Sequence, residues 1–345
     1  MWQVIGQARA VSLLAHSLES GTLSHAYLFI GPQHVGKMTL ALNLAQALNC
    51  RADDRPCLEC DSCRKIAAGT HSDIQVIGLA QNEEENTEAK LIHTEQVKDV
   101  LHSASLPPFE GMNKVFIIDG AELLSIEAAN RLLKTLEEPE ARVTFILLTT
   151  DENKLLKTVI SRCQRIELPP MSIAAEAQAL VEKRGIGPER ARLLAGLSHG
   201  CPGWAIAAAS DEKIMEQRDK ELDQIIAIIE GGFEERFAYA ARLARGFTQN
   251  RRAVYNILDT WLDFWRDLML VKLEREEMIT NIDKKDDIIK KAGNYNLPGI
   301  RGFIQSAASA GRQLKQNVNP QLALEVLMLD IPGEEAKSSP IVSGA

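Results

Sequence analysis

The chain has 345 residues, of which 25% are charged and 45% are apolar, and its formal net charge is −8. This length predicts roughly two or three domains, and the composition is typical of a globular protein without a strong overall attraction for nucleic acid. No apolar run reaches the roughly 18 residues of a membrane span, and the N-terminal MWQVIGQARA lacks the basic and apolar regions of a signal peptide. We therefore expect no membrane role and a cytoplasmic protein whose six cysteines stay reduced.

Short apolar runs rich in β-branched residues alternate with helical patterns in the first half of the chain. The expected strands are 26–30, 74–79, 115–118, 143–148 and 164–168. Apolar residues at helical spacing lie between them, at 37–48, 94–105 and 125–138. Strands that alternate with helices predict a parallel sheet covered on both faces. Pro169 and Pro170 end this α/β region, because proline interrupts both ladders and helices.

The rest of the chain has a helical pattern only. The segment 171–210 is short and rich in Ala and Leu, and it contains the turn-forming sequence Gly200-Cys201-Pro202-Gly203. Longer helices are expected over 211–330, with breaks near 231–232, 293–299 and 317–320. The tail 331–345 is small and polar and is predicted to be disordered. We therefore expect an α/β domain over 1–170, a small helical domain over 171–210 and a helical domain over 211–330.

A phosphate-binding loop is predicted between the first strand and the helix that follows it. Residues 31–39 are GPQHVGKMT, in which Gly31, Gly36 and Lys37 have the spacing GxxxxGK in strand-to-helix context. The backbone N–H groups of such a loop cradle phosphates, and the lysine reaches the terminal ones. The alternative is an ordinary strand-to-helix turn that contains glycine.

Three residues of this loop depart from the usual pattern. The position after the lysine normally carries a hydroxyl that binds Mg²⁺, but Met38 stands there, and a thioether has little affinity for hard cations. Thr39 comes one residue late, which turns its side chain by about 100° around the helix. His34 adds bulk where many such loops have glycine. Binding of ATP and Mg²⁺ is therefore doubtful.

A second acidic motif follows the strand 115–118. Asp119 is expected at the end of this strand, where a Walker B aspartate supports Mg²⁺. In hydrolysing proteins of this kind a glutamate comes next and polarises the attacking water, but here the next residue is Gly120. We expect the strand-to-helix turn to direct Glu122 elsewhere. Hydrolysis by this chain is therefore not expected.

Four cysteines lie within fourteen residues, with the spacing C-x₆-C-x₂-C-x₂-C: Cys50, Cys57, Cys60 and Cys63. Four thiolates at this spacing can surround one tetrahedral Zn²⁺ and leave no open coordination position, so the site would be structural. An iron–sulfur cluster and unmetallated thiols are the alternatives. Cys163 and Cys201 are expected to pack in the interior.

Several segments together resemble the bacterial clamp-loader family of AAA+ proteins. They are Ile5-Gly6-Gln7, residues 24–29 (SHAYLF), the phosphate loop, the cysteine cluster, residues 130–139 (NRLLKTLEEP) and Ser161-Arg162-Cys163. The similarity is close over residues 1–210, and beyond them only the helical character agrees. The resemblance implies an AAA+ module, with a RecA-like domain over 1–170, a zinc insertion at 50–63 and a helical lid over 171–210. A collar domain for oligomerisation would then occupy 211–330.

The family also implies roles and partners. Arg162 would be the arginine finger, which reaches into the ATP site of a neighbouring subunit and stabilises the charge that develops on the transferred phosphoryl group. Thr149 and Thr150 would lie near the polar sensor 1 position, with ordinary strand-end hydrogen bonding as an equal alternative. In the collar, the apolar face of 253–271 fits packing between subunits or the domain's own core. The implied partners are the gamma/tau and delta clamp-loader subunits, the beta sliding clamp and, within the complex, primed DNA.

The motor subunits of this family keep three residues that this chain lacks. Met38 replaces the hydroxyl residue, Gly120 replaces the glutamate, and Gly203 stands where the sensor 2 motif has an arginine. These departures predict a largely non-hydrolysing subunit that donates Arg162 to a motor neighbour in DNA replication. One alternative is an ATP-hydrolysing subunit of gamma/tau type or another AAA+ ATPase. Another is a stand-alone zinc-dependent DNA-binding protein, which the low basicity disfavours.

Overall fold

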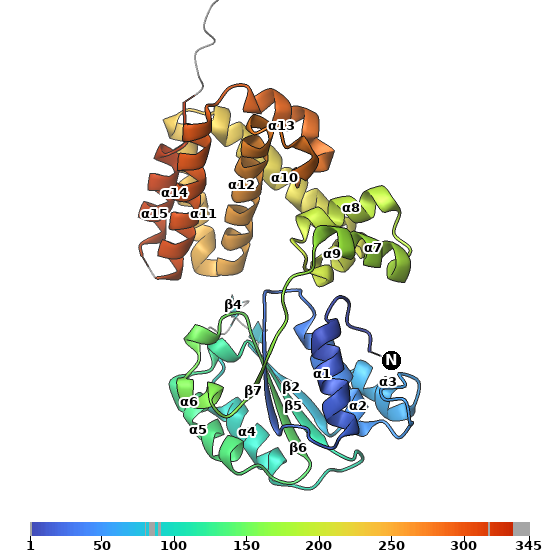
Figure 1. Ribbon diagram of the computed structural model, residues 1–345. Helices are drawn as coiled ribbons and strands as arrows, with labels where there is room; N and C mark the ends of the chain where they lie inside the picture. Colours follow the sequence, from blue (N-terminus) through green and yellow to red (C-terminus); the bar gives the residue numbers. More distant parts are fainter. Residues whose placement is uncertain (1, 80, 83–86, 89–90, 317, 334–345) are drawn as a thin grey trace, which may run out of the picture. The chain divides into compact units, whose positions relative to one another are not determined.

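The structure is a computed structural model that describes residues 2–79, 81–82, 87–88, 91–316 and 318–333 (Figure 1). The predicted disordered tail lies outside the described residues from position 334 onward. The chain divides into two compact units, which are described separately: the first contains residues 1–191 and 198–205, and the second contains 192–197 and 206–345. The finer division into three domains stays a prediction.

A five-stranded parallel sheet in the order β2-β5-β6-β1-β7 forms the centre of the first unit. Its strands are β1 (Ala26–Ile30), β2 (Ile74–Ile77), β5 (Lys114–Asp119), β6 (Val143–Thr149) and β7 (Gln164–Glu167). This confirms the predicted parallel sheet. A short antiparallel pair, β3 (Gln81–Asn82) and β4 (Thr87–Glu88), lies outside it.

Helices cover both faces of this sheet, because the strands have alternating apolar residues that point to opposite sides (Figure 1). Tyr27 and Phe29 of β1 pack with α1 (Ala8–Glu19) and α2 (Lys37–Asn49). Leu28 packs on the other face, where the covering helices are α4 (Thr94–Ala104), α5 (Ile126–Glu137) and α6 (Lys157–Ile160). A further short helix, α3 (Asp61–Ala67), lies within the predicted metal-binding insertion and just after it, and short 3₁₀ helices occupy Ala121–Leu123 and Glu152–Lys154.

Three further helices follow the sheet: α7 (Ile173–Arg184), α8 (Pro188–Leu197) and α9 (Pro202–Ser210). Helix α9 begins inside the sequence that was expected to form only a turn. Proline is favoured in the first turn of a helix because its missing N–H is not needed there, so Pro202 starts α9. The predicted turn therefore extended too far, because Pro202 and Gly203 belong to α9.

The second unit is helical throughout its described part. Its long helices are α10 (Glu212–Glu230), α11 (Phe233–Gln249), α12 (Arg251–Lys272), α13 (Lys285–Ala292), α14 (Leu297–Lys315) and α15 (Pro320–Leu329), with short 3₁₀ helices at Glu276–Met278 and Ile282–Lys284. The side chains of Trp261, Phe264 and Trp265 are buried in the core that these helices enclose. Of the two interpretations of 253–271, the structure supports the unit's own core for these three aromatic residues.

Candidate functional site

The phosphate loop connects the end of β1 to the start of α2. Gly36 has a φ of +107°, and a Cβ added at Gly31 would lie 2.4 Å from the backbone oxygen of Leu168. The backbone therefore requires glycine at both positions. The Lys37 ammonium donates to the backbone oxygens of Gly31 (2.6 Å) and Pro32 (2.7 Å). The three residues of the GxxxxGK pattern thus lie together at the C-terminal end of a central strand.

The three unusual residues of the loop have different environments. Met38 is half-buried and packs against the apolar core, whereas Thr39 is exposed. His34 has a φ of +61°, in the left-handed region, which costs a non-glycine residue about 1–2 kcal/mol. The loop therefore keeps a backbone suited to glycine at position 34, although a histidine occupies it.

Two carboxylates lie at or just after the C-terminal end of β5. Asp119 is the last residue of this strand, and Glu122 accepts hydrogen bonds from the backbone N–H (3.2 Å) and the hydroxyl (2.6 Å) of Thr150. Burial lowers the pKa of Lys37, and the negative charges of Glu122 and Asp119 oppose that effect. The Glu122 side chain is therefore held by Thr150, just after the end of β6. Glu122 lies in the 3₁₀ helix Ala121–Leu123, which follows Gly120.

The start of α9 contacts the phosphate loop directly. The backbone N–H of Gly203 donates to the backbone oxygen of His34 at 2.8 Å, and a Cβ at position 203 would lie 2.7 Å from the same oxygen. No larger side chain fits there unless one of the two backbones moves. Position 203, where the resemblance predicts that the sensor 2 arginine is lost, therefore has room only for glycine.

Arg162 lies between α6 and β7, and its side chain is 31% exposed. Its Nη1 donates to the backbone oxygen of Thr158 at 2.8 Å, and its Nη2 forms an ion pair with Glu137 at the end of α5. The segments NRLLKTLEEP and Ser161-Arg162-Cys163 therefore meet at this ion pair. The sequence did not single out Glu137 as a site residue. The signal that could have indicated it is the acidic pair Glu137-Glu138 at the end of its helix.

Arg162 and the phosphate loop lie at opposite ends of the parallel strands. Strands β1 and β7 are parallel neighbours, with Tyr27 paired to Gln164 and Ile30 to Glu167. The phosphate loop follows the end of β1, whereas Arg162 precedes the start of β7. A strand of four to five residues at ~3.3 Å per residue therefore separates them. Arg162 cannot reach the phosphate loop of its own chain.

The four clustered cysteines have their sulfur atoms within 4.8 Å of one another: Cys50, Cys57, Cys60 and Cys63. Sulfurs around a tetrahedral Zn²⁺ with Zn–S bonds of ~2.3 Å are about 3.8 Å apart, which this cluster fits with little adjustment. Hydrogen bonds from the backbone N–H groups of Cys60 and Glu59 lower the pKa of Cys57 to about 6, which favours the metal-binding thiolate. This cluster can therefore hold a metal ion.

The two remaining cysteines lie apart from this cluster. Cys201 is buried in the core that packs on α1 and α2, and Cys163 is half-buried against the core of the opposite face. Burial raises the pKa of Cys163 to about 12 and also raises the pKa of Cys201. Both are interior packing residues, as predicted.

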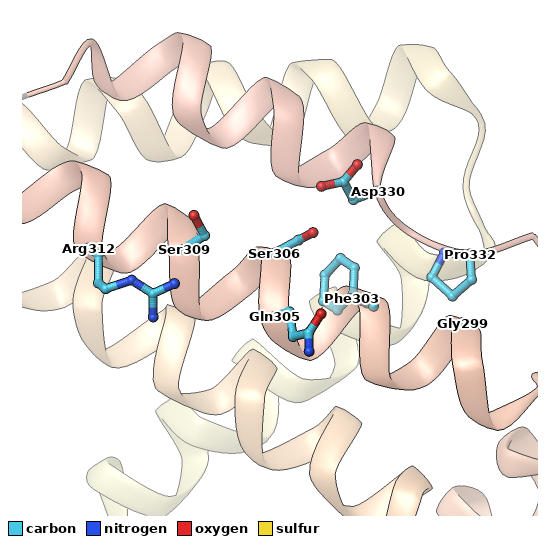
Figure 2. A pocket seen from close by; sticks show the side chains of 9 residues that line it. Gly299, Phe303, Gln305, Ser306, Ser309, Arg312, Asp330 and Pro332 are labelled. Carbon is cyan, nitrogen blue, oxygen red and sulfur yellow. The ribbon is translucent and has the colours of Figure 1, made fainter.

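The second unit has a surface groove between α14 and α15. It is lined by residues of α14 and by the segment just after α15, including Gly299, Gly302, Ser306, Ser309, Asp330 and Pro332 (Figure 2). None of the predicted site residues lines it, since all of them belong to the first unit.

The chain is similar to several known proteins. Residues 6–172 match the family described as "DNA polymerase III, delta subunit". The DNA polymerase III subunit delta' of Bacillus subtilis is 28% identical over 324 residues, which are 94% of this chain and 95% of that protein. The DNA polymerase III subunit tau of Bacillus subtilis is 40% identical over 166 residues, which are 48% of this chain and 28% of that protein. A solved Thermotoga maritima structure titled a "dna polymerase iii, gamma subunit-related protein" has a TM-score of 0.40 and 13% identity, and the match covers 92% of this chain and 98% of that one.

The parallel sheet with its phosphate loop, followed by helices, is the fold expected of an AAA+ module. The chain is similar to bacterial DNA polymerase III subunits, to the delta family over residues 6–172 and to a delta' subunit along nearly its whole length. Among the helices of the described residues, none is long and apolar enough to cross a membrane.

Proposed function

We propose that this chain serves as a delta'-type subunit of the clamp loader, in which it hydrolyses little ATP itself and donates Arg162 to a neighbouring motor subunit. The observation that carries this proposal is the position of Arg162. It lies at the N-terminal end of the parallel strands, whereas the phosphate loop of the same chain lies at their C-terminal end. A phosphoryl group that this arginine touches must therefore belong to another subunit. The work of the complex would be to load the beta sliding clamp onto primed DNA.

An arginine suits this task for physical reasons. Its guanidinium stays charged and presents a planar set of donors, which can stabilise the charge that develops on the transferred phosphoryl group. Arginine fingers supplied by a neighbour accelerate such reactions by about 10³–10⁵-fold. The ion pair with Glu137 and the bond to Thr158 support this role, because they hold a partly exposed guanidinium in one place.

Weak hydrolysis by this chain is supported by the loop itself. Met38 offers no hydroxyl to Mg²⁺, and Gly120 offers no carboxylate next to Asp119. The close contact between Gly203 and His34 leaves no room for a sensor arginine. Gly31, Gly36, Lys37, Thr39 and Asp119 would then form a degenerate nucleotide site in which binding of ATP and Mg²⁺ is doubtful.

The remaining parts of the chain would serve assembly. Helix α15 carries Leu322, Val326 and Leu329 on one exposed side, at a spacing of i, i+4 and i+7. Such a stripe supports collar packing of 211–330 against the gamma/tau and delta subunits. The metal site would hold Zn²⁺, since four thiolates select zinc or iron–sulfur clusters and this set leaves no coordination position open. Its role would be structural.

The test is to reconstitute the clamp loader with the wild-type chain and with Arg162→Ala. We expect the variant to assemble. The ATP hydrolysis that clamp and primed DNA stimulate should fall at the ATP site of the motor subunit next to this chain. Lysine should rescue poorly, because a point charge lacks the planar set of donors. Arg165→Ala is the matched control, since Arg165 is a partly exposed arginine three residues away that pairs with Glu152. Normal hydrolysis and clamp loading in a fully assembled Arg162→Ala complex would remove the arginine finger from this proposal.

One observation favours the alternative of an ATP-hydrolysing subunit. Glu122 is hydrogen-bonded to Thr150 and acts electrostatically on Lys37, so a carboxylate lies near the phosphate loop despite Gly120. Steady-state ATP turnover by the isolated chain distinguishes the two functions. We expect negligible turnover. A rate comparable to that of a motor subunit, abolished by Lys37→Ala and by Glu122→Gln, would establish the alternative.

A further inference from the structure

Helix α2 runs from the phosphate loop to the cysteine cluster, and it carries three buried amide side chains. Asn43, Gln46 and Asn49 are each 2% exposed, and their spacing of three residues places them along one side of the helix. Amide side chains are mostly exposed in proteins, because a buried amide needs hydrogen-bond partners for the polar groups that leave water. The partners of these three side chains therefore show what the helix holds in place.

Gln46 is bonded to the backbone of a cluster cysteine. Its Nε2 donates to the backbone oxygen of Cys63 at 2.9 Å, and its Oε1 accepts from the Nδ2 of Asn43 at 3.0 Å. The Asn43 side-chain oxygen in turn accepts the backbone N–H of Gln3 at 2.7 Å. This order fixes the direction of both amides, because a flipped Gln46 would turn its oxygen towards the Cys63 oxygen. Gln46 therefore presents a fixed donor to Cys63.

Asn49 holds the other end of the cluster, because it directly precedes Cys50 in the chain. Its Oδ1 accepts the backbone N–H groups of Met112 (2.8 Å) and Asn113 (2.9 Å). The Asn113 side chain donates to the backbone oxygen of Leu48 at 2.9 Å. The last turn of α2, which Cys50 follows, is therefore tied to the segment before β5.

The four cysteines form two pairs with different surroundings. Cys50 and Cys63 are buried, and both are fixed through the amides of α2. Cys57 and Cys60 are half-buried. Their backbone N–H groups donate to sulfur atoms of the cluster itself, at 3.5 Å to Cys50 and 3.4 Å to Cys57. The first pair is therefore attached to the core of the first unit, whereas the second pair is bonded to other cysteines.

We propose that Gln46 is a positioning residue of the metal site, which holds Cys63 in its ligand position before a metal binds, and that Asn49 does the same for Cys50. Metal binding then requires ordering of only the loop that carries Cys57 and Cys60, which costs less conformational entropy than ordering all four ligands. Groups that orient metal ligands typically contribute about 10–100-fold to metal affinity. This inference rests on the metal site of the proposed function.

The experiment measures the Kd for Zn²⁺ of the purified full chain by competition with a chromophoric chelator. Gln46→Met keeps the length of the side chain but removes the donor to Cys63, so we expect the Kd to rise about 10–100-fold. Gln178→Met is the matched control, since Gln178 is an exposed glutamine of α7 that bonds to Glu182. It should leave the Kd unchanged.

Alkylation of the metal-free chain separates positioning from a general loss of stability. In the wild type the two half-buried cysteines should react first with a thiol reagent, because Cys50 and Cys63 are buried. Gln46→Met should make Cys63 reactive and leave Cys50 protected, and Asn49→Leu should do the reverse. A chain that is merely destabilised would expose both buried cysteines together. Mass analysis of the peptides measures the modification at each cysteine.

The outcomes distinguish the metal site from the positioning role. A wild-type chain that binds no Zn²⁺ would contradict the metal site of the proposed function. In a chain that binds Zn²⁺, an unchanged Kd in Gln46→Met, or equal reactivity of Cys50 and Cys63 in that variant, would overturn the positioning role. If Gln46→Met does not fold, Asn43→Leu tests the same hydrogen bonds, because it frees the Gln46 amide to turn, and it should also raise the Kd.

Discussion

The guanidinium of Arg162 is ion-paired with the carboxylate of Glu137, 25 residues earlier in the chain. The pair joins the end of α5 to the turn before β7. Both residues lie at the N-terminal end of the parallel strands, away from the phosphate loop. In the proposed function Glu137 is a positioning residue, because its carboxylate contacts the Arg162 guanidinium.

The first prediction concerns this positioning role. Glu137→Gln should lower kcat for ATP hydrolysis by the neighbouring motor subunit and leave its KM for ATP unchanged, because the arginine loses its orientation but keeps its charge. The loss should be smaller than the ~10³-fold or greater effect of removing an arginine finger. The free energy of unfolding should change by no more than ~1 kcal/mol, since the pair is partly exposed. ATPase kinetics of the assembled complex and thermal unfolding of the chain are the measurements. An unchanged kcat would contradict the positioning role.

The second prediction concerns the metal. The purified chain should contain about one Zn²⁺, and serine at Cys50, Cys57, Cys60 or Cys63 should reduce its content, because each thiolate supplies one of four ligands. Elemental analysis and a chromophoric chelator measure content and release. Cys163→Ser is the control and should retain the metal, since Cys163 lies outside the cluster. A folded, metal-free chain after growth with zinc would count against the site.

The sequence predicted the features that depend on local pattern. The buried strands have continuous apolar runs, and the phosphate loop and the cysteine module have diagnostic spacing within a few residues. It did not predict contacts between segments distant in the chain, such as Arg162 with Glu137 or Asp73 with the backbone of 109–111. These contacts depend on which strands are neighbours in the sheet, and spacing alone does not encode that order. Helix α1 was missed, and the hydrogen bonds from Thr150 to Glu122 were not predicted either.

The third prediction compares two helical glycines. Gly203→Ala should destabilise the first unit by ~1–3 kcal/mol, because its Cβ would overlap the backbone oxygen of His34. Gly311→Ala on α14 should instead stabilise the second unit by ~0.5–1 kcal/mol, since its Cβ would meet nothing within 4 Å and alanine favours helix. Thermal and denaturant unfolding measure both variants. If the two substitutions have equal effects, the contact between α9 and the phosphate loop is not as close as described.

The last prediction is a pH dependence that arises from Glu176 on α7. Its side chain is fully buried, and the Ser198 hydroxyl donates to its Oε1 at 2.7 Å. Burial raises the pKa of Glu176 to about 7, although the bonds from Ser198 and Gly200 and the nearby His199 oppose the shift. The folded state therefore retains a proton that the unfolded chain, with a pKa near 4.5, releases. The associated stability is fully present below pH 4.5 and is lost as the pH rises to about 7.

Glu176→Gln should remove this dependence, because an amide keeps the shape of the carboxyl but does not ionise. Relative to the wild type, the variant should gain stability with rising pH, by up to ~2–3 kcal/mol between pH 5 and pH 8. Thermal unfolding of both chains across this range measures the difference. Glu182→Gln, on the exposed side of the same helix, is the control and should show no such trend. If Glu176→Gln has the same effect at pH 5 and at pH 8, the buried carboxyl does not titrate in this range.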